Sequence, residues 1–166
     1  MNHVGHVGLT LLIFSFLALP FGFSENAVIL IVLAAGLSSL PDIDIRFEIK
    51  HRTYTHNIFA ALIFGIVFGF ILFYAGGLLW GIIGFAAAFG GTMSHLLGDI
   101  IAGKRLNGSP WEIKPLWPFS DKLVGFGWFY ASDKKMNERL MKMGTLAFVF
   151  YLLVTTGVLQ EIFAGL

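Results

Sequence analysis

Two residues near the end of a long apolar run have the types and the spacing that metal chemistry requires. His95 and Asp99 are four residues apart, so on a helix they lie on one face, one turn apart. An imidazole and a carboxylate presented in this way can hold a divalent ion from a rigid support. A hydrogen-bonded pair at a helix end is the ordinary alternative. The pair therefore indicates a metal site only if further ligands reach it.

Further candidate ligands lie at the ends of the other apolar runs. Asp42 and Asp44 follow a proline that should stop a helix, although an Asp in such a turn often only bonds its own backbone. His51 and His56 flank the start of the next run, and His6 opens the first one. His6 is the weakest of these candidates taken alone. We predict His6, Asp42, His51, His56, His95 and Asp99 as metal ligands.

Two charged residues have competing interpretations. Arg52 directly follows His51, and its planar guanidinium matches the oxygens of a phosphate. It is equally well explained as a positive anchor beside the membrane. Glu138 either stabilises the first turn of a helix or reaches back to the site. His51 itself either binds metal or orients a ligand.

The composition is that of an integral membrane protein. The chain has 166 residues, of which 57% are hydrophobic, and a mean hydropathy of +0.80. These values predict a single membrane-embedded domain over residues 1–166. Apolar runs of about 20 residues can cross the hydrocarbon core. We predict an all-α bundle of about five transmembrane helices, at 4–23, 27–40, 56–74, 77–101 and 145–166, with Thr55 capping the third.

The positive charges predict the orientation. All 11 Lys and Arg residues lie in two connections, one around residues 46–52 and one in the long extramembrane loop at 103–144. The positive-inside rule places both connections, and the N-terminus, in the cytoplasm. We therefore predict a multi-pass protein of the plasma (inner) membrane. The same span order brings all the candidate His and Asp residues to the cytoplasmic side.

The composition also limits the chemistry. The chain has no cysteine, which excludes disulfides and thiolate ligands. His and carboxylate ligands suit zinc first, as one or two Zn²⁺ ions, with Mn²⁺ or Mg²⁺ as alternatives. The net charge of +1 gives no reason to expect nucleic-acid binding.

In their order along the chain, these motifs resemble the YdjM/DUF457 family, which is described as membrane-bound, metal-dependent hydrolases. The resemblance covers about residues 5 to 140, and Glu138 falls where the family tends to have a glutamate. This chain has Ile45 and Asn57 where many members have His and Ser. The motifs that carry the resemblance are Gly5-His6, Leu40-Pro41-Asp42-Ile43-Asp44, His51-Arg52-Thr53-Tyr54-Thr55-His56-Asn57, Ser94-His95-Leu96-Leu97-Gly98-Asp99, Gly108 and Pro115-Leu116-Trp117-Pro118.

A more distant resemblance concerns the zinc-dependent phospholipase C and P1 nuclease group. It implies a bridging role for Asp42. That group also has a late His-rich motif without a counterpart here, so one or two metals are favoured over three. The ligands that it implies are His6, Asp42, His56, His95 and Asp99.

These observations predict a membrane-embedded metal-dependent hydrolase. The resemblance implies a phosphoesterase that acts on a phospholipid or lipid-linked phosphate at the cytoplasmic interface, with membrane lipids around it. Asp44 is the candidate general base or second-metal ligand, and Arg52 the candidate phosphate contact. The alternatives are a metal-ion transporter and a non-catalytic protein whose helix ends are stapled by metal. A transporter should carry its polar sites near the middle of the bilayer.

Overall fold

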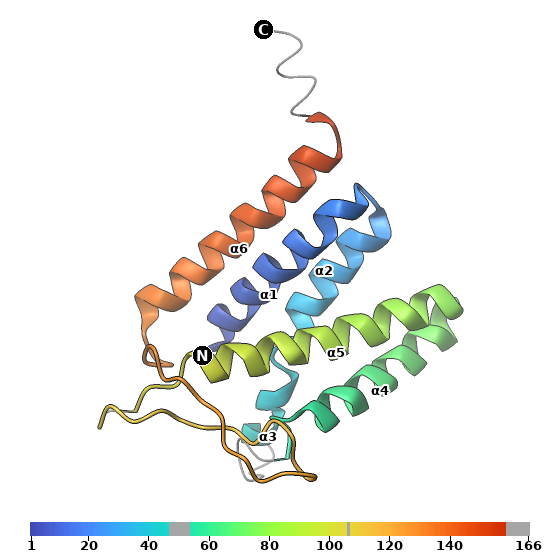
Figure 1. Ribbon diagram of the computed structural model, residues 1–166. Helices are drawn as coiled ribbons and strands as arrows, with labels where there is room; N and C mark the ends of the chain where they lie inside the picture. The colour runs from blue at the N-terminus through green and yellow to red at the C-terminus, as the bar shows by residue number, and fades with distance from the viewer. Residues whose placement is uncertain (47–53, 106, 159–166) are drawn as a thin grey trace, which may run out of the picture.

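The regular elements of the chain are helices (Figure 1) in the residues that the computed structural model describes, namely 1–46, 54–105 and 107–158. Four helical stretches are long and apolar enough to cross a membrane, His3–Phe21, Glu25–Asp42, Ile58–Gly76 and Leu78–Ile101. The predicted all-α membrane fold is confirmed. In order, the elements are α1 (His3–Ala18), η1 (Leu19–Phe21), α2 (Glu25–Leu37), η2 (Leu40–Asp42), α3 (Ile43–Arg46), α4 (Ile58–Gly76), α5 (Leu78–Ile101) and α6 (Lys134–Thr155).

The fifth long helix, α6, joins a charged first half to an apolar second half. It begins at Lys134, because the Asp133 side chain accepts a hydrogen bond from the Met136 backbone N–H at 3.0 Å and so caps the helix. The predicted fifth span, 145–166, is described only as far as residue 158. α6 is accordingly not among the four candidate spans found in the described residues.

Helix α5 is the centre of the bundle, since it packs against α4, α2 and α1, while α6 packs along α1 (Figure 1). Gly77 joins α4 to α5 with a φ of +81°, a conformation that glycine adopts without strain. Close packing of small residues holds these helices together, as expected in lipid. A Cβ atom added at Gly69 would lie only 3.1 Å from the carbonyl oxygen of Gly81.

The up-and-down order of the helices brings five helix ends to one end of the bundle, which we name the polar end. The starts of α1, α4 and α6 meet the ends of α2 and α5 there, and the long connection from 102 to 133 runs beside them (Figure 1). The helices are apolar along most of their lengths, whereas the polar end holds buried His and Asp side chains. The fold thus gathers the described candidate ligands at or beside helix ends.

The start of α4 differs from the sequence prediction. Asn57, and not Thr55, is the cap, because the Asn57 Oδ1 accepts a hydrogen bond from the Ala60 N–H at 2.7 Å. The helix therefore begins at Ile58, and Thr55 and His56 remain in the non-helical lead-in. This leaves the Thr55 hydroxyl available to another partner at the polar end. Asn is among the preferred N-cap residues because its side-chain oxygen can accept this hydrogen bond.

Replacing Asn57 by alanine should destabilise the protein by about 1 kcal/mol or more. The change removes the cap and also the hydrogen bond that Asn57 Nδ2 donates to the Tyr54 carbonyl at 2.9 Å, in a fully buried position. Thermal unfolding in mild detergent measures the loss, with Asn57→Ser as the matched control that keeps a capping oxygen. Equal melting temperatures for the wild type and Asn57→Ala would contradict the assignment of the cap.

Candidate metal centre

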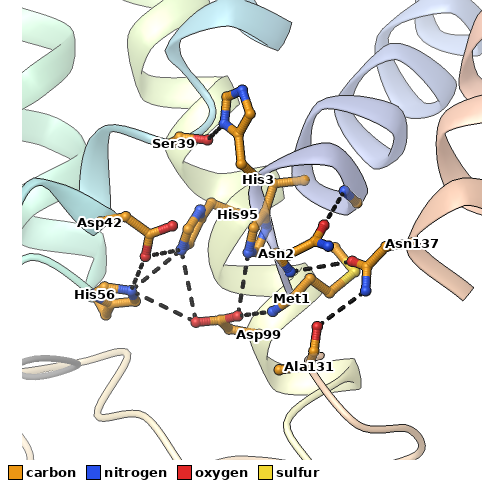
Figure 2. A network of polar contacts seen from close by, with 12 residues as sticks. Met1, Asn2, His3, Ser39, Asp42, His56, His95, Asp99, Ala131 and Asn137 are labelled. Carbon is orange, nitrogen blue, oxygen red and sulfur yellow. Dashed lines mark hydrogen bonds and ion pairs between the residues drawn. The ribbon is translucent and has the colours of Figure 1, made fainter. Parts of the chain in front are cut away.

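Four side chains at the polar end point their ligand atoms at one another (Figure 2). Asp42 comes from η2, His56 from the lead-in to α4, and His95 and Asp99 from the last two turns of α5. The two imidazoles are fully buried, Asp99 is 2% exposed, and Asp42 is 29% exposed. We name the ligand atoms of this group the His–Asp tetrad: His56 Nε2, His95 Nε2, Asp42 Oδ1 and Asp99 Oδ2.

Five distances within the tetrad, all of which involve His56 or His95, are close to those between two ligands of one metal ion. His56 Nε2 and His95 Nε2 are 3.2 Å apart. The Asp42 oxygen lies 3.5 Å from the first nitrogen and 3.6 Å from the second, and the Asp99 oxygen lies 3.6 Å and 3.7 Å from them. Ligands about 2.0–2.1 Å from a tetrahedral zinc ion are about 3.3–3.4 Å apart. The pairs that include His56 or His95 therefore have the spacing of ligands that share one such ion.

His6 adds a fifth candidate ligand beside the tetrad. Its Nε2 lies 3.4 Å from the other oxygen of Asp99, Oδ1, and its ring stacks on the His95 ring with centroids 3.6 Å apart. Two charged rings stacked in this way would repel each other, which favours the neutral imidazoles that bind metals. The Asp99 Oδ1 also lies 2.5 Å from the amino nitrogen of Met1.

Unsatisfied ring nitrogens show that a metal ion fits this donor set. Both nitrogens of His6 and the Nδ1 of His95 are buried and lack a hydrogen-bond partner among the described residues. Buried polar atoms are nearly always paired, so an orphaned imidazole needs an explanation. Two groups have ligand atoms that all lie within 4.8 Å of one another and could hold an ion: His6, Asp42 and His95, and His56, His95 and Asp99.

Asp44 lies on the opposite side of the His56 ring from the tetrad. Its Oδ2 is 3.3 Å from the His56 Nδ1 and accepts a hydrogen bond from the Thr55 hydroxyl at 2.6 Å. The Thr55 oxygen is itself 2.9 Å from the same Nδ1. Because the Thr55 proton goes to Asp44, this arrangement places a proton on Nδ1 and presents the lone pair of Nε2 to the tetrad.

The remaining predicted residues fall into two groups. His51 and Arg52 lie outside the described residues, so their roles stay predictions. Glu138 is on the first turns of α6, where it is half-exposed and lies 3.9 Å from the Lys134 ammonium. It is therefore explained as a surface helix residue.

Sequence reasoning missed Asn137, which ties α6 to the polar end. Its Oδ1 accepts a hydrogen bond from the Asn2 N–H at 3.2 Å, and its Nδ2 donates to the Ala131 carbonyl (Figure 2). The same Nδ2 also donates to the Asp133 carbonyl. The residue is buried, although it sits in a run of charged residues that reads as a solvated helix face. The sequence carries no local signal for this burial, because it depends on which face of α6 packs on α1.

Comparison with known proteins gives a family for this arrangement of helices and ligands. The family model described as YdjM inner membrane protein matches residues 1–163. The chain belongs to the YdjM family of inner membrane proteins. No match was found among curated proteins or among solved structures. The predicted family is thus confirmed, and every member of the tetrad lies within the matched YdjM region.

Proposed function

We propose that this YdjM-family chain is a membrane-embedded, metal-dependent hydrolase, and specifically a phosphoesterase. The observation that carries the proposal is the His–Asp tetrad, in which oxygens of Asp42 and Asp99 each lie 3.5–3.7 Å from the Nε2 atoms of two buried histidines. Ionisable groups within membrane segments are costly and mark functional sites. A bound divalent ion would activate water and polarise a phosphoryl group.

We propose zinc as the ion. Imidazole nitrogens together with carboxylate oxygens suit zinc, whereas magnesium and manganese prefer an octahedral set of oxygens. The two candidate ligand groups both include His95, so we propose that the protein binds one ion before any second. A second ion would lie on the side of His6 and Asp99 Oδ1, with carboxylates shared between the two.

Substrate would approach from the side of Asp42, the tetrad residue that is most exposed. Asp42 lines a hollow of ≈380 Å³ together with His3 and Ser39, whose side chains hydrogen bond to each other at 2.5 Å. The tetrad residues would hold the ion, which would supply an activated water for attack on the substrate. Asp42 is the tetrad carboxylate that lines this hollow.

Asp44 acts in this proposal through His56, as the residue that holds the ring and its proton in place. Its described contacts are with the Nδ1 side of that ring and with Thr55, so they support positioning more than the role of general base. Arg52 remains our candidate for the phosphate contact. The substrate class, a phospholipid or lipid-linked phosphate, follows from a site at the end of four candidate spans. The clustered Lys and Arg residues support the cytoplasmic side for this end.

The test of this function is turnover by purified protein in mild detergent. We expect release of phosphate or a phosphorylated headgroup from phosphatidic acid, phosphatidylglycerol or a polyprenyl phosphate, lost on treatment with a chelator and restored by zinc. Zinc flux into proteoliposomes would instead support the transporter. Bound metal without turnover on any of these substrates would support the non-catalytic alternative. Within the candidate spans, the described His, Asp and Glu residues lie near helix ends, which disfavours transport.

Replacing Asp44 by asparagine should weaken metal binding about 10- to 100-fold, as losses of outer carboxylate partners do. The reason is that an uncharged amide at this position would no longer hold the proton on the His56 Nδ1. Competition with a chelator of known affinity measures the change. The same change at Asp121, an exposed carboxylate paired with Lys114, should leave the metal affinity unaltered. An unaltered metal affinity in Asp44→Asn would contradict the positioning role.

A further inference from the structure

A second polar site lies in the connection between α5 and α6, away from the tetrad. It is an open hollow of ≈620 Å³. None of its lining residues belongs to the tetrad or to the hollow beside Asp42. Its main lining residues are Lys104, Arg105, Asn107, Trp111, Tyr130 and Ser132.

Backbone hydrogen bonds give this hollow a defined frame. The Lys104 N–H donates to the Phe129 carbonyl at 3.0 Å, and the Arg105 N–H donates to the Ser109 carbonyl at 2.8 Å. Gly108 closes the turn with a φ of +85°. The Oδ1 of Asn107 accepts from the backbone N–H and the hydroxyl of Ser109, so the N–H groups of that amide remain for a ligand.

Both cations of the hollow are held by aromatic rings and not by carboxylates. The Arg105 guanidinium carbon lies 4.2 Å from the centroid of the Trp111 ring, and the Lys104 ammonium lies 5.6 Å from that of Tyr130. Among the described residues, neither cation lies within ion-pair distance of an acidic side chain, whereas Lys114 is paired with Asp121 at 2.5 Å. A guanidinium stacked on a ring keeps its N–H edge free for an oxyanion.

We propose that this hollow binds a phosphate group, and that the group belongs to the headgroup of an anionic membrane lipid. Two adjacent cations, an amide and a hydroxyl offer the donors that phosphate oxygens accept. The neighbouring Asp133 carboxylate accepts the Met136 N–H at the start of α6 and is not among the residues that line the hollow. The aromatic residues Trp111 and Tyr130 are exposed by 44% and 39%, as expected for side chains at the headgroup level of a membrane. This site is separate from the proposed hydrolase activity, and it would bind the lipid phosphate whether or not the tetrad is catalytic.

The experiment compares three probes on purified, delipidated full-length protein in neutral detergent. The probes are dioctanoyl phosphatidylglycerol, dioctanoyl phosphatidylcholine and inorganic phosphate, with binding followed by native mass spectrometry. The test variant is Lys104→Gln/Arg105→Gln. The matched control is Lys122→Gln/Lys135→Gln, which removes the same charge from exposed residues of the same polar end. Metal content is measured for each protein, so that failure of the metal centre is seen separately.

We expect phosphatidylglycerol to bind the wild type and the control equally, and the test variant about 10-fold more weakly, because charge-assisted hydrogen bonds are lost. Phosphatidylcholine should bind weakly to all three proteins. Binding of inorganic phosphate as tight as that of phosphatidylglycerol, and lost in the same variant, would support the site but assign it to a free anion. Equal binding of phosphatidylglycerol by the wild type and the test variant would overturn the proposal. An equal loss of phosphatidylglycerol binding in the control variant would also overturn the proposal.

Discussion

Replacing Asp99 by asparagine should remove bound metal and abolish hydrolysis while leaving the helices folded. Each oxygen of Asp99 faces different partners, since Oδ2 lies 3.6 Å and 3.7 Å from His56 and His95, and Oδ1 lies 3.4 Å from His6. The amide has the same shape but no charge, and its nitrogen cannot bind a cation. We expect metal affinity to fall by more than about 100-fold, beyond the loss that outer partners cause, and turnover to fall below detection.

The matched control for this prediction is Asp121→Asn. Asp121 is a fully exposed carboxylate paired with Lys114, and the Lys114 ammonium holds the pKa of that carboxyl below its usual range. The same chemical change there should leave metal and activity unaltered, because exposed ion pairs contribute little. Metal content, activity and thermal unfolding are compared for the three proteins. A folded, active Asp99→Asn protein that retains its metal would remove this residue from the site.

Replacing Gly144 by leucine should separate α1 from α6 and destabilise the protein by about 3 kcal/mol, at the upper end of the range for overpacked cores. A Cβ atom at Gly144 would collide with the backbone carbonyl of Gly8. A Cβ atom at Gly8 would collide with the backbone of Leu140 and Met141. Backbone atoms cannot rotate away as a side chain can, so the two helices would have to move apart.

The control for this clash is Gly36→Leu. Gly36 is an exposed helical glycine of α2, and a Cβ atom there would meet nothing within 4 Å. We expect its stability to stay within about 1 kcal/mol of the wild type, since only helix propensity changes. The midpoint of thermal unfolding in mild detergent measures both variants. Unfolding of Gly144→Leu at the wild-type midpoint would show that α1 and α6 do not pack in this way.

The order of the helices explains why the convergence of ligands could be predicted from the sequence. Apolar runs that alternate in direction place every second helix end on the same side, so the positions of Asp42, His56, His95 and Asp99 follow from counting spans. The four-residue spacing of His95 and Asp99 predicted that the two side chains share one face of a helix. The family was likewise predicted from ordered motifs and confirmed over residues 1–163. These are properties of the chain order and need no knowledge of packing.

Details that depend on competing hydrogen bonds could not be predicted. Thr55 and Asn57 are both able caps, and the choice of Asn57 depends on Asp44 accepting the Thr55 hydroxyl. The buried position of Asn137 depends on the rotation of α6 against α1. The distances between the ligand atoms of the tetrad depend on side-chain positions that no sequence pattern encodes. His51 and Arg52 lie outside the described residues, so their roles stay predictions.

The central claim, that the His–Asp tetrad holds a divalent ion, is tested most directly by the metal content of the protein. The protein is purified in mild detergent without a metal-affinity step, and metals are measured by elemental analysis beside the His56→Ala and Asp99→Ala variants. We predict one or two equivalents of zinc in the wild type and loss of that zinc in both variants. A folded wild-type protein that holds no metal, even after zinc is added back, would contradict the account and leave the tetrad as a hydrogen-bonded network at the helix ends.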